Sequence, residues 1–196
     1  MLEREVKLRF ASVDEARAVL QAAGAAPLRG RRLQNDDLYD TADGALRARR
    51  CALRVRQEAG VTRLTFKGPL QPGLVKQREE QETAVEDGAA LVRVLDALGY
   101  HRWFRYQKYR EEFSAPDVVV ALDETPVGTF VEIEGSEDGI VRMAAAMGRN
   151  HADFILESYR ALFVRDGRAC GVTGPDMLFT APAHIDVPGR GVAAEP

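Results

Sequence analysis

A strict alternation of charged and apolar residues opens the chain and restricts its fold more than any other feature. Residues 2–10 carry charge at every odd position and mainly apolar side chains at even positions: Glu3, Glu5, Lys7 and Arg9 against Leu2, Val6, Leu8 and Phe10. Successive side chains of a β-strand point to opposite faces, so a period of two indicates a strand rather than a helix. The sequence therefore predicts a strand with one fully charged face.

The same alternation recurs on later segments, where the charges are sorted by sign. Acidic pairs two residues apart occur at Glu3/Glu5, Glu80/Glu82 and Glu132/Glu134, and basic pairs at Arg54/Arg56 and Lys108/Arg110. Taken singly, each face is typical of a strand surface in water. If the strands close into a barrel, however, these rows would lie opposite one another across a lumen. Buried charges are costly unless they are paired or ligand-bound, which favours a lumen that receives a metal ion and a multiply charged anion.

Periodicity and turn residues predict an α+β fold of consecutive, antiparallel strands with few helices. Eight strands are predicted at residues 2–10, 33–40, 51–58, 62–67, 74–85, 101–114, 117–123 and 128–135. Four helices are predicted at residues 12–23, 87–98, 136–147 and 152–164. The stripe of Leu91, Val94, Leu95 and Leu98 has helical spacing and is expected to pack in the core. One domain over residues 1–180 and a disordered tail over residues 181–196 are expected.

Composition excludes several classes of protein. The 196 residues are 45% hydrophobic, which suits one globular domain, and a net charge of −3 argues against a nucleic-acid-binding protein. The chain contains no run of eighteen apolar residues that would predict a membrane span, and its first residues form a strand pattern rather than a signal peptide. Cys51 and Cys170 lack a nearby thiol or imidazole partner, so we expect free thiols, no zinc site and a cytoplasmic location.

Lysine is scarce and occurs at selected positions. Only four lysines occur against twenty-three arginines, and all four lie on alternating segments: Lys7, Lys67, Lys76 and Lys108. Lysine carries a compact ammonium charge, whereas arginine carries a planar guanidinium group, and both bind phosphate oxygens. Carboxylate oxygens on neighbouring strands suit Mg²⁺ or Mn²⁺. The combination indicates a polyphosphate site assisted by a metal ion.

Seven motifs occur in order along the chain. They are Glu3-Arg4-Glu5-Val6-Lys7, Leu53-Arg54-Val55-Arg56, Thr65-Phe66-Lys67-Gly68, Arg78-Glu79-Glu80-Gln81-Glu82, Lys108-Tyr109-Arg110, Leu122-Asp123-Glu124 and Phe130-Val131-Glu132-Ile133-Glu134-Gly135. The first resembles the ExExK signature of the CYTH superfamily, the triphosphate tunnel metalloenzymes. ExExK alone is a weak pattern, but the ordered set resembles this family over residues 1 to about 165.

The resemblance implies an eight-stranded antiparallel barrel whose tunnel binds a triphosphate together with Mg²⁺ or Mn²⁺. Carried onto this chain, the metal-binding residues would be Glu3, Glu5, Glu132 and Glu134, with Asp123, Glu80 and Glu82 assisting. The phosphate-binding residues would be Arg54, Arg56, Lys67, Lys76, Arg78, Lys108 and Arg110. Lys7 and Lys67 would be catalytic, with Lys7 near the reacting phosphoryl group. The sequence leaves a homodimer open.

Three functions fit this pattern. The favoured one is metal-dependent hydrolysis of inorganic, nucleoside or thiamine triphosphate, because hydrolysis is the more widespread chemistry of the family. The second is a class IV adenylate cyclase, in which the 3′-hydroxyl of ATP replaces water as the nucleophile. The third is a polyphosphate- or nucleotide-binding module without turnover.

Other candidate residues are interpreted structurally. Asp36, Asp37 and Asp40 are expected at a solvated strand end rather than in a metal site. Trp103, Phe104 and Tyr106 could stack on a base or pack in the core. Ser158-Tyr159 is expected to pack rather than to take part in chemistry.

Overall fold

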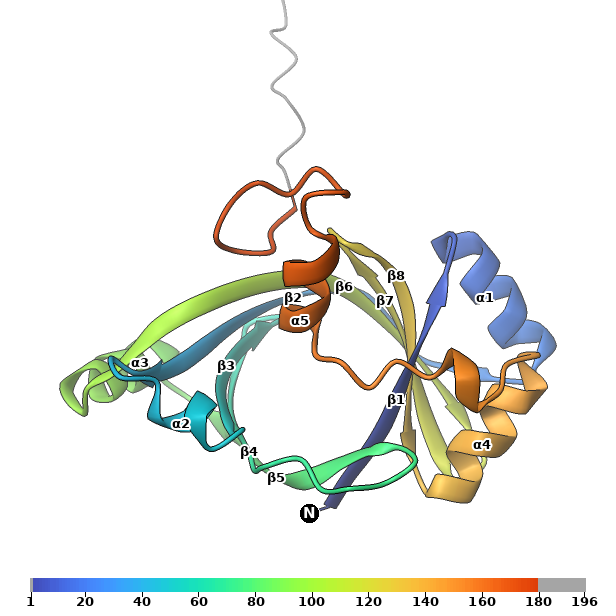
Figure 1. Cartoon of the computed structure of the whole chain (residues 1–196), viewed down its shortest axis with the longest axis horizontal. Coiled ribbons are helices and arrows are strands. Elements are labelled where there is room, and N and C mark those ends of the chain that lie inside the picture. The colour runs from blue at the N-terminus through green and yellow to red at the C-terminus, as the bar shows by residue number, and fades with distance from the viewer. Residues whose placement is uncertain (1, 180–196) are drawn as a thin grey trace, which may run out of the picture.

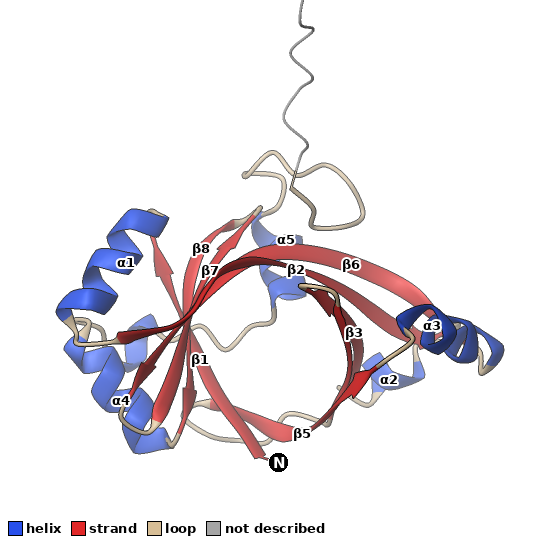
Figure 2. Cartoon of the chain, turned by 180° about the vertical axis from the view of Figure 1, so that it is seen from behind, coloured by secondary structure: helices blue, strands red, loops and turns tan. Residues whose placement is uncertain are grey.

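The computed structural model describes residues 2–179, and the tail expected to be disordered, residues 181–196, lies outside that range. Eight antiparallel strands form one closed barrel, visible in cross-section in Figure 2. Their order around the barrel is β1-β5-β4-β3-β2-β6-β7-β8. The strands are β1 (Leu2–Phe10), β2 (Ala26–Thr41), β3 (Ala52–Glu58), β4 (Val61–Lys67), β5 (Lys76–Val85), β6 (Tyr100–Ala115), β7 (Val118–Thr125) and β8 (Gly128–Gly135). The predicted α+β class and antiparallel barrel are confirmed.

β1, the first strand, closes the barrel because it pairs with β5 on one side and with β8, the last strand, on the other. Its first half pairs with β5, where Glu3 lies opposite Arg78. The rest of the strand pairs with β8, where Lys7 lies opposite Glu132. Glu3, Glu5 and Lys7 of β1 line the lumen beside charges of both signs, whereas Arg9 pairs with Asp166 outside the cavity.

The main apolar core lies outside the barrel. The even-numbered residues Val6 and Leu8 of β1 pack with outward-facing residues of β7 and β8, such as Ile133. Helices α1 (Val13–Ala22) and α4 (Glu137–Ala146) cover this face, to which they contribute Leu20 and Ile140. Figure 1 shows both helices on the same side of the barrel. Fully burying each such aliphatic side chain stabilises the fold by about 1.5–3 kcal/mol.

The remaining helices lie at other edges of the barrel. α2 (Ala45–Ala48) connects β2 to β3, α3 (Gly88–Ala97) connects β5 to β6, and α5 (Tyr159–Asp166) lies across one opening of the barrel. Side-chain caps begin α1 and α4 as their sequences predict, because Ser12 accepts a hydrogen bond from the Glu15 backbone N–H and Ser136 from that of Gly139. None of the helices in the described range is long and apolar enough to cross a membrane.

Two predicted elements differ from the structure. β2 begins at Ala26 rather than at residue 33, because its first residues pair with the long β6, as far as Ser114. The helix predicted at residues 152–164 is interrupted after a short 3₁₀ turn (His151–Asp153). Ile155 is extended there and exchanges two backbone hydrogen bonds with Lys7, of 2.9 and 3.1 Å. α5 then begins as a new helix after its N-cap, Ser158.

The apolar stripe of α3 is only partly buried, which corrects the expectation that it forms core. Leu95 packs against Tyr39 and Val55, whereas Val94 and Leu98 are 54% and 66% exposed. The helix lies at one edge of the barrel, where Figure 1 shows no layer covering its outer side.

The junction between β8 and α4 requires glycine at position 135, which predicts a large cost for a single methyl group. A Cβ at Gly135 would lie 2.2 Å from the carbonyl oxygen of Asp117. At Gly148, which also has a positive φ, a Cβ would meet no atom within 4 Å. We expect Gly135→Ala to lower the free energy of unfolding by about 1–3 kcal/mol more than Gly148→Ala, because only the first adds a clash. Urea denaturation of both variants measures the difference, and equal losses would contradict this account.

Candidate functional site

The barrel lumen holds a cavity of about 660 Å³ that brings the predicted charges together. Every residue predicted to bind metal or phosphate lines this cavity except Asp123. The cavity-lining members are Glu3, Glu5, Lys7, Arg54, Arg56, Lys67, Lys76, Arg78, Glu80, Glu82, Lys108, Arg110, Glu132 and Glu134. They come from six of the eight strands, all but β2 and β7, so the site exists only when the barrel is closed.

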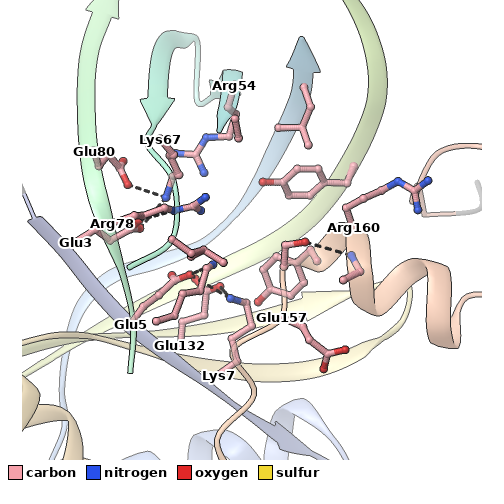
Figure 3. A pocket seen from close by; sticks show the side chains of 18 of the residues that line it. Glu3, Glu5, Lys7, Arg54, Lys67, Arg78, Glu80, Glu132, Glu157 and Arg160 are labelled. Atoms are coloured by element: carbon pink, nitrogen blue, oxygen red, sulfur yellow. Dashed lines mark hydrogen bonds and ion pairs between the residues drawn. The ribbon is translucent and has the colours of Figure 1, made fainter. Parts of the chain in front are cut away.

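Carboxylates of β1 and β5 alternate with ammonium groups along one side of the cavity. Lys67 Nζ contacts Glu3 Oε1 and Glu80 Oε2, both at 2.6 Å. Lys76 donates to Glu5, the next acidic residue along β1. Figure 3 shows Lys67 pointing toward Glu3 and Glu80 in the lumen. The acidic pair of β1 is therefore held from two directions by lysines of β4 and β5.

Lys7 occupies the centre of the cluster. Its Nζ lies 3.0 Å from Glu132 Oε1 and 3.3 Å from Glu5 Oε1, and the side chain is almost completely buried. Burial alone would lower the pKa of Lys7, but the charges of Glu132 and Glu5 outweigh it and raise the pKa above its ordinary value. Lys7 is therefore a permanent cation at neutral pH.

Two other buried lysines behave in the opposite way. Burial lowers the pKa of Lys76 to about 8, although Glu5 partly offsets it, and nearby Lys7 and Arg78 lower it further. Burial and the positive charge of Arg110 lower the pKa of Lys108 to about 8. Each of these lysines contacts a carboxylate and also lies near other cations, so an anionic ligand would relieve the repulsion between the cations.

Glu134 of β8 lies in a region of excess negative charge, directly opposite Glu5 in the pairing of β8 with β1. Its side chain remains open to solvent in the cavity but is surrounded by protein atoms. This partial burial, followed by the charges of Glu3 and Glu5, raises the pKa of Glu134 to about 7. Three carboxylates that oppose one another's ionisation form an oxygen-only donor set, which fits a hard divalent cation.

The carboxylates do not converge on one point. Within residues 2–179, no three His, Cys, Asp or Glu side chains meet in a geometry that could hold a metal ion. The cause is visible in the contacts above, because Glu3 and Glu5 turn toward lysines. The chemistry of the donor set thus fits Mg²⁺ or Mn²⁺, provided that these ion pairs open.

The opposite wall contains a carboxylate that the sequence analysis interpreted incorrectly. Asp36 is fully buried rather than solvated, and it accepts two hydrogen bonds from Arg56, of 2.7 and 3.1 Å. Arg54 Nε lies 3.6 Å from the same carboxylate. Register explains the contact, since Asp36 lies directly opposite Arg56 in the β2–β3 pair. Asp36 therefore positions two of the predicted phosphate-binding arginines.

Asp123 has a similar position behind Arg110 and Lys108. It is completely buried, with Arg110 donating to both of its oxygens at 2.7 and 2.6 Å and Lys108 donating at 2.8 Å. A third donor is the hydroxyl of Tyr159, at 2.7 Å. In this arrangement its oxygens face cations rather than the open cavity.

Tyr159 packs in an aromatic cluster, as the sequence analysis expected, but it also lines the cavity, which the sequence analysis did not predict. It lies on α5 yet enters the barrel, where its ring centroid is 5.1 Å from Lys7 Nζ and 4.8 Å from Lys108 Nζ. Burial and the charge of Asp123 raise the pKa of Tyr159 well above its ordinary value, so the hydroxyl remains a donor. The only sequence signal was Ser158, an N-cap that starts a helix at this residue.

Comparison with known proteins supports one family and one fold. The sequence model of the CYTH domain matches residues 1–147. A protein of Methanocaldococcus jannaschii whose name proposes an adenylate cyclase is 28% identical over 158 residues, which cover 80% of this chain and 85% of that protein.

Solved structures share the barrel. A proposed adenylate cyclase from Vibrio parahaemolyticus superposes with a TM-score of 0.74 at 20% identity, covering 84% of this chain and 98% of that one. A proposed adenylyl cyclase from Hippeastrum, reported to show a dominant triphosphatase activity, gives a TM-score of 0.64 at 21% identity and covers 83% and 95%. At these identities the likeness shows the fold alone.

Removing the charge of Asp36 is expected to destabilise the barrel. Asp36→Asn leaves Arg56 and Arg54 buried without their counter-charge, which should cost about 3–5 kcal/mol of unfolding free energy. The matched control, Arg142→Ala, removes an exposed ion pair with Asp117 and should cost less than about 1 kcal/mol. Denaturant unfolding at pH 7 compares the two variants. If Asp36→Asn lowers the free energy of unfolding by no more than the control does, the ion pair of Asp36 with Arg56 does not stabilise the barrel.

Glu134 gives a pH dependence whose sign follows from its raised pKa. Its pKa in the folded protein is about 7, above the ordinary value of 4.5. Its contribution to stability is therefore fully present below pH 4.5 and is lost as the pH rises to 7. In the presence of EDTA, we expect Glu134→Gln to become more stable relative to the wild type across this interval. Thermal unfolding at pH 4.5 and pH 8 tests this, and a constant difference between the two proteins would contradict it.

Proposed function

The chain belongs to the CYTH domain family, and on that premise we propose that it is a metal-dependent triphosphatase that hydrolyses a triphosphate inside the barrel. The observation that carries this proposal is the enclosure of opposing rows of cations and carboxylates in one cavity. Members of the family typically require a metal ion and bind triphosphate substrates. A polyphosphate neutralised partly by metal would meet both rows at once.

The phosphate chain would be held by the basic residues of four strands. Arg54 and Arg56 on β3 carry planar guanidinium groups, which can make two parallel hydrogen bonds to phosphate oxygens. Arg110 and Lys108 on β6 are fixed from behind by Asp123, so their remaining N–H groups can be directed to a ligand. Lys67, Lys76 and Arg78 would complete the set from β4 and β5.

A divalent metal would be held by Glu3, Glu5, Glu132 and Glu134, with Glu80 and Glu82 at the edge. When bound, such an ion neutralises phosphate charge and orients or activates water as a nucleophile. Asp123 was predicted to assist, but it would first have to release Arg110, Lys108 and Tyr159.

Lys7 would stabilise the charge that develops on the transferred phosphoryl group. It keeps its positive charge at neutral pH and is held between two carboxylates, so its ammonium group is positioned before the substrate binds. Lys67, fixed between Glu3 and Glu80, would act in the same way from β4. The mechanism therefore consists of positioning and charge stabilisation, as in other phosphoryl transfers.

The second candidate is an adenylate cyclase, and the names of the Methanocaldococcus and Vibrio relatives favour it. The triphosphatase activity reported for the Hippeastrum protein supports hydrolysis on the same fold. Both reactions would use the cavity described above. In hydrolysis, water would attack the γ-phosphorus and release phosphate, whereas in cyclisation the ribose 3′-hydroxyl would attack the α-phosphorus and release pyrophosphate. A binding module without turnover is the third candidate.

Analysis of the reaction products separates these candidates. We expect the purified chain with Mg²⁺ or Mn²⁺ to release inorganic phosphate from ATP or from inorganic triphosphate, and EDTA to abolish the release. Cyclic AMP with pyrophosphate as the main products of ATP would instead identify the cyclase. Tight triphosphate binding with neither product would identify a binding module.

Substitutions in the acidic cluster test the assignment of the site. Lys7→Ala and Glu5→Gln are each expected to lower kcat/KM for the best triphosphate by about 100-fold, because each removes a positioned charge in an enclosed site. Arg142→Ala, which changes an exposed residue of α4, serves as the control and should retain activity. Wild-type rates for both cavity variants, with their folding verified, would refute the assignment.

A further inference from the structure

Apolar packing fixes the ring of Tyr159 at the first turn of α5. The ring centroid lies 5.6 Å from that of Phe130, in an edge-to-face arrangement, and 6.2 Å from that of Tyr106. Both rings belong to an apolar cluster that also contains Leu162 of the same helix. Tyr159 is only 6% exposed, so its ring cannot move far without opening this cluster.

Two contacts tie the segment around Tyr159 to β1. Before the helix, Ile155 exchanges two backbone hydrogen bonds with Lys7. At the last residue of α5, Asp166 pairs with Arg9 of the same strand. Figure 1 shows α5 held across the barrel opening between these points. Because β1 carries both the anchors of α5 and the ammonium group of Lys7, the backbone sets the position of Tyr159 relative to the charged cluster.

The hydroxyl of Tyr159 completes the hydrogen bonding of Asp123, a fully buried carboxylate. The Oδ2 atom accepts from this hydroxyl at 2.7 Å, from Lys108 Nζ at 2.8 Å and from Arg110 Nη2 at 2.6 Å. The Oδ1 atom accepts from Arg110 Nε at 2.7 Å. A carboxylate offers about four acceptor positions, and four hydrogen bonds occupy them here. The hydroxyl is therefore directed at a protein group and not at the open part of the cavity.

The ring of Tyr159 faces two lysines that also contact Glu132. Its centroid is 5.1 Å from Lys7 Nζ and 4.8 Å from Lys108 Nζ. The carboxylate of Glu132 lies 3.0 Å from the first ammonium group and 3.8 Å from the second. Cations are attracted to the face of an aromatic ring. The ring and the carboxylate together restrict both flexible side chains, so their conformational entropy is lost before a substrate binds.

We propose that Tyr159 is a positioning residue of the triphosphate site, which orients Lys7 and the cations around Asp123 without touching the substrate. This inference rests on the proposed function and adds to it a residue of α5, beyond the segment that matches the family model. Charges stabilise a transition state most when they are oriented before the reaction begins. The total charge that attracts a triphosphate does not depend on the hydroxyl, so its loss should affect the chemical step more than binding.

Tyr159→Phe tests the hydroxyl, because phenylalanine keeps the ring and its packing. We expect kcat for the best triphosphate to fall by about tenfold and KM to change by less than about threefold, since a hydrogen bond to a charged group is lost but no cation is removed. Urea denaturation verifies that the variant is folded under the assay conditions. An unchanged kcat in the folded variant would overturn the proposal.

The matched control is Tyr109→Phe. It removes a hydroxyl from the residue that follows Lys108 on β6, where the ring lies outside the cavity and contacts Phe179. Because this side chain contacts none of the cavity cations, both kcat and KM should stay within about twofold of the wild type. A loss in the control equal to that of Tyr159→Phe would mean that the effect is not specific to the Asp123 cluster, and it would also overturn the proposal.

A double-mutant cycle with Lys108→Met separates positioning from an independent effect. Methionine keeps much of the side-chain volume but removes the charge that the hydroxyl helps to orient. In this background, Tyr159→Phe is expected to slow the chemical step by only about threefold or less, because Arg110 alone remains to be oriented through Asp123. Single-turnover assays with excess enzyme keep the slow variants measurable. The same tenfold loss in both backgrounds would show that Tyr159 acts independently of Lys108, contrary to the proposal.

Lysine signals in NMR spectra provide a readout that needs no turnover, because the chain contains only four lysines. With ¹³C-labelled lysine, Tyr159→Leu is expected to shift the ε-methylene signals of Lys7 and Lys108, which face the ring, and to leave the other two lysines unshifted. Tyr159→Phe should shift the signal of Lys108 more than that of Lys7, because only Lys108 shares Asp123 with the hydroxyl. Unshifted signals in both variants would contradict the proposal.

The outcomes distinguish this inference from the proposed function. If the wild type turns over triphosphate but the variants contradict the positioning role, the triphosphatase stands alone. If cyclic AMP is the main product, the triphosphatase fails, and the same variants are compared on that product. If triphosphate binds without turnover, the triphosphatase again fails, and the Lys108 signal in Tyr159→Phe decides the positioning role: a shift supports it and no shift overturns it. If no triphosphate binds, both proposals fail.

Discussion

Lys7 lies between Glu5 and Glu132 in an enclosed lumen, and the rest of the structure depends on charges being paired in this way. An ordinary small barrel fills its interior with apolar side chains. Here the interior is charged, so the apolar residues of the same strands face outward and must be covered by α1 and α4. The charged lumen and the external core are thus two consequences of a single alternation. Shifting the register of β1 by one residue would turn its apolar side chains into the lumen and its charged side chains toward α1 and α4.

The pairing also determines how the site can respond to ligands. Most of the buried charges are compensated by protein, as Asp36 is by Arg56 and Asp123 is by Arg110. Like charges also lie close together in two places, where Glu134 is near Glu3 and Glu5 and Lys108 is near Arg110. A cation at the first place and an anion at the second would each relieve repulsion, so a metal-bound polyphosphate matches the residual charge of both walls.

Much of this could be predicted from sequence because strand periodicity is local. The charged face of β1 and the positions of Lys67 and Glu132 follow from a period of two, which needs no knowledge of partners. Asp36 was misread because its burial depends on register with β3, which local sequence does not encode. The place of Tyr159 in the cavity was missed for a similar reason, since a helix in sequence gives no sign that it crosses the barrel opening. The break before α5 arises from pairing of Ile155 with β1, again a tertiary contact.

Two parts of the chain line the cavity: the CYTH domain and the C-terminal segment that follows it. The CYTH match ends at residue 147, and the central cluster lies entirely within it. Tyr159 and Arg160 lie beyond it, yet both line the cavity, and the Tyr159 ring contacts Lys7 and Lys108. A charged tunnel can bind any triphosphate, because phosphate groups are alike in all of them. Selection among triphosphates would therefore have to come from residues that contact the rest of the substrate, and the cavity is also lined by Arg47 of α2, Trp103 of β6 and Arg160 of α5.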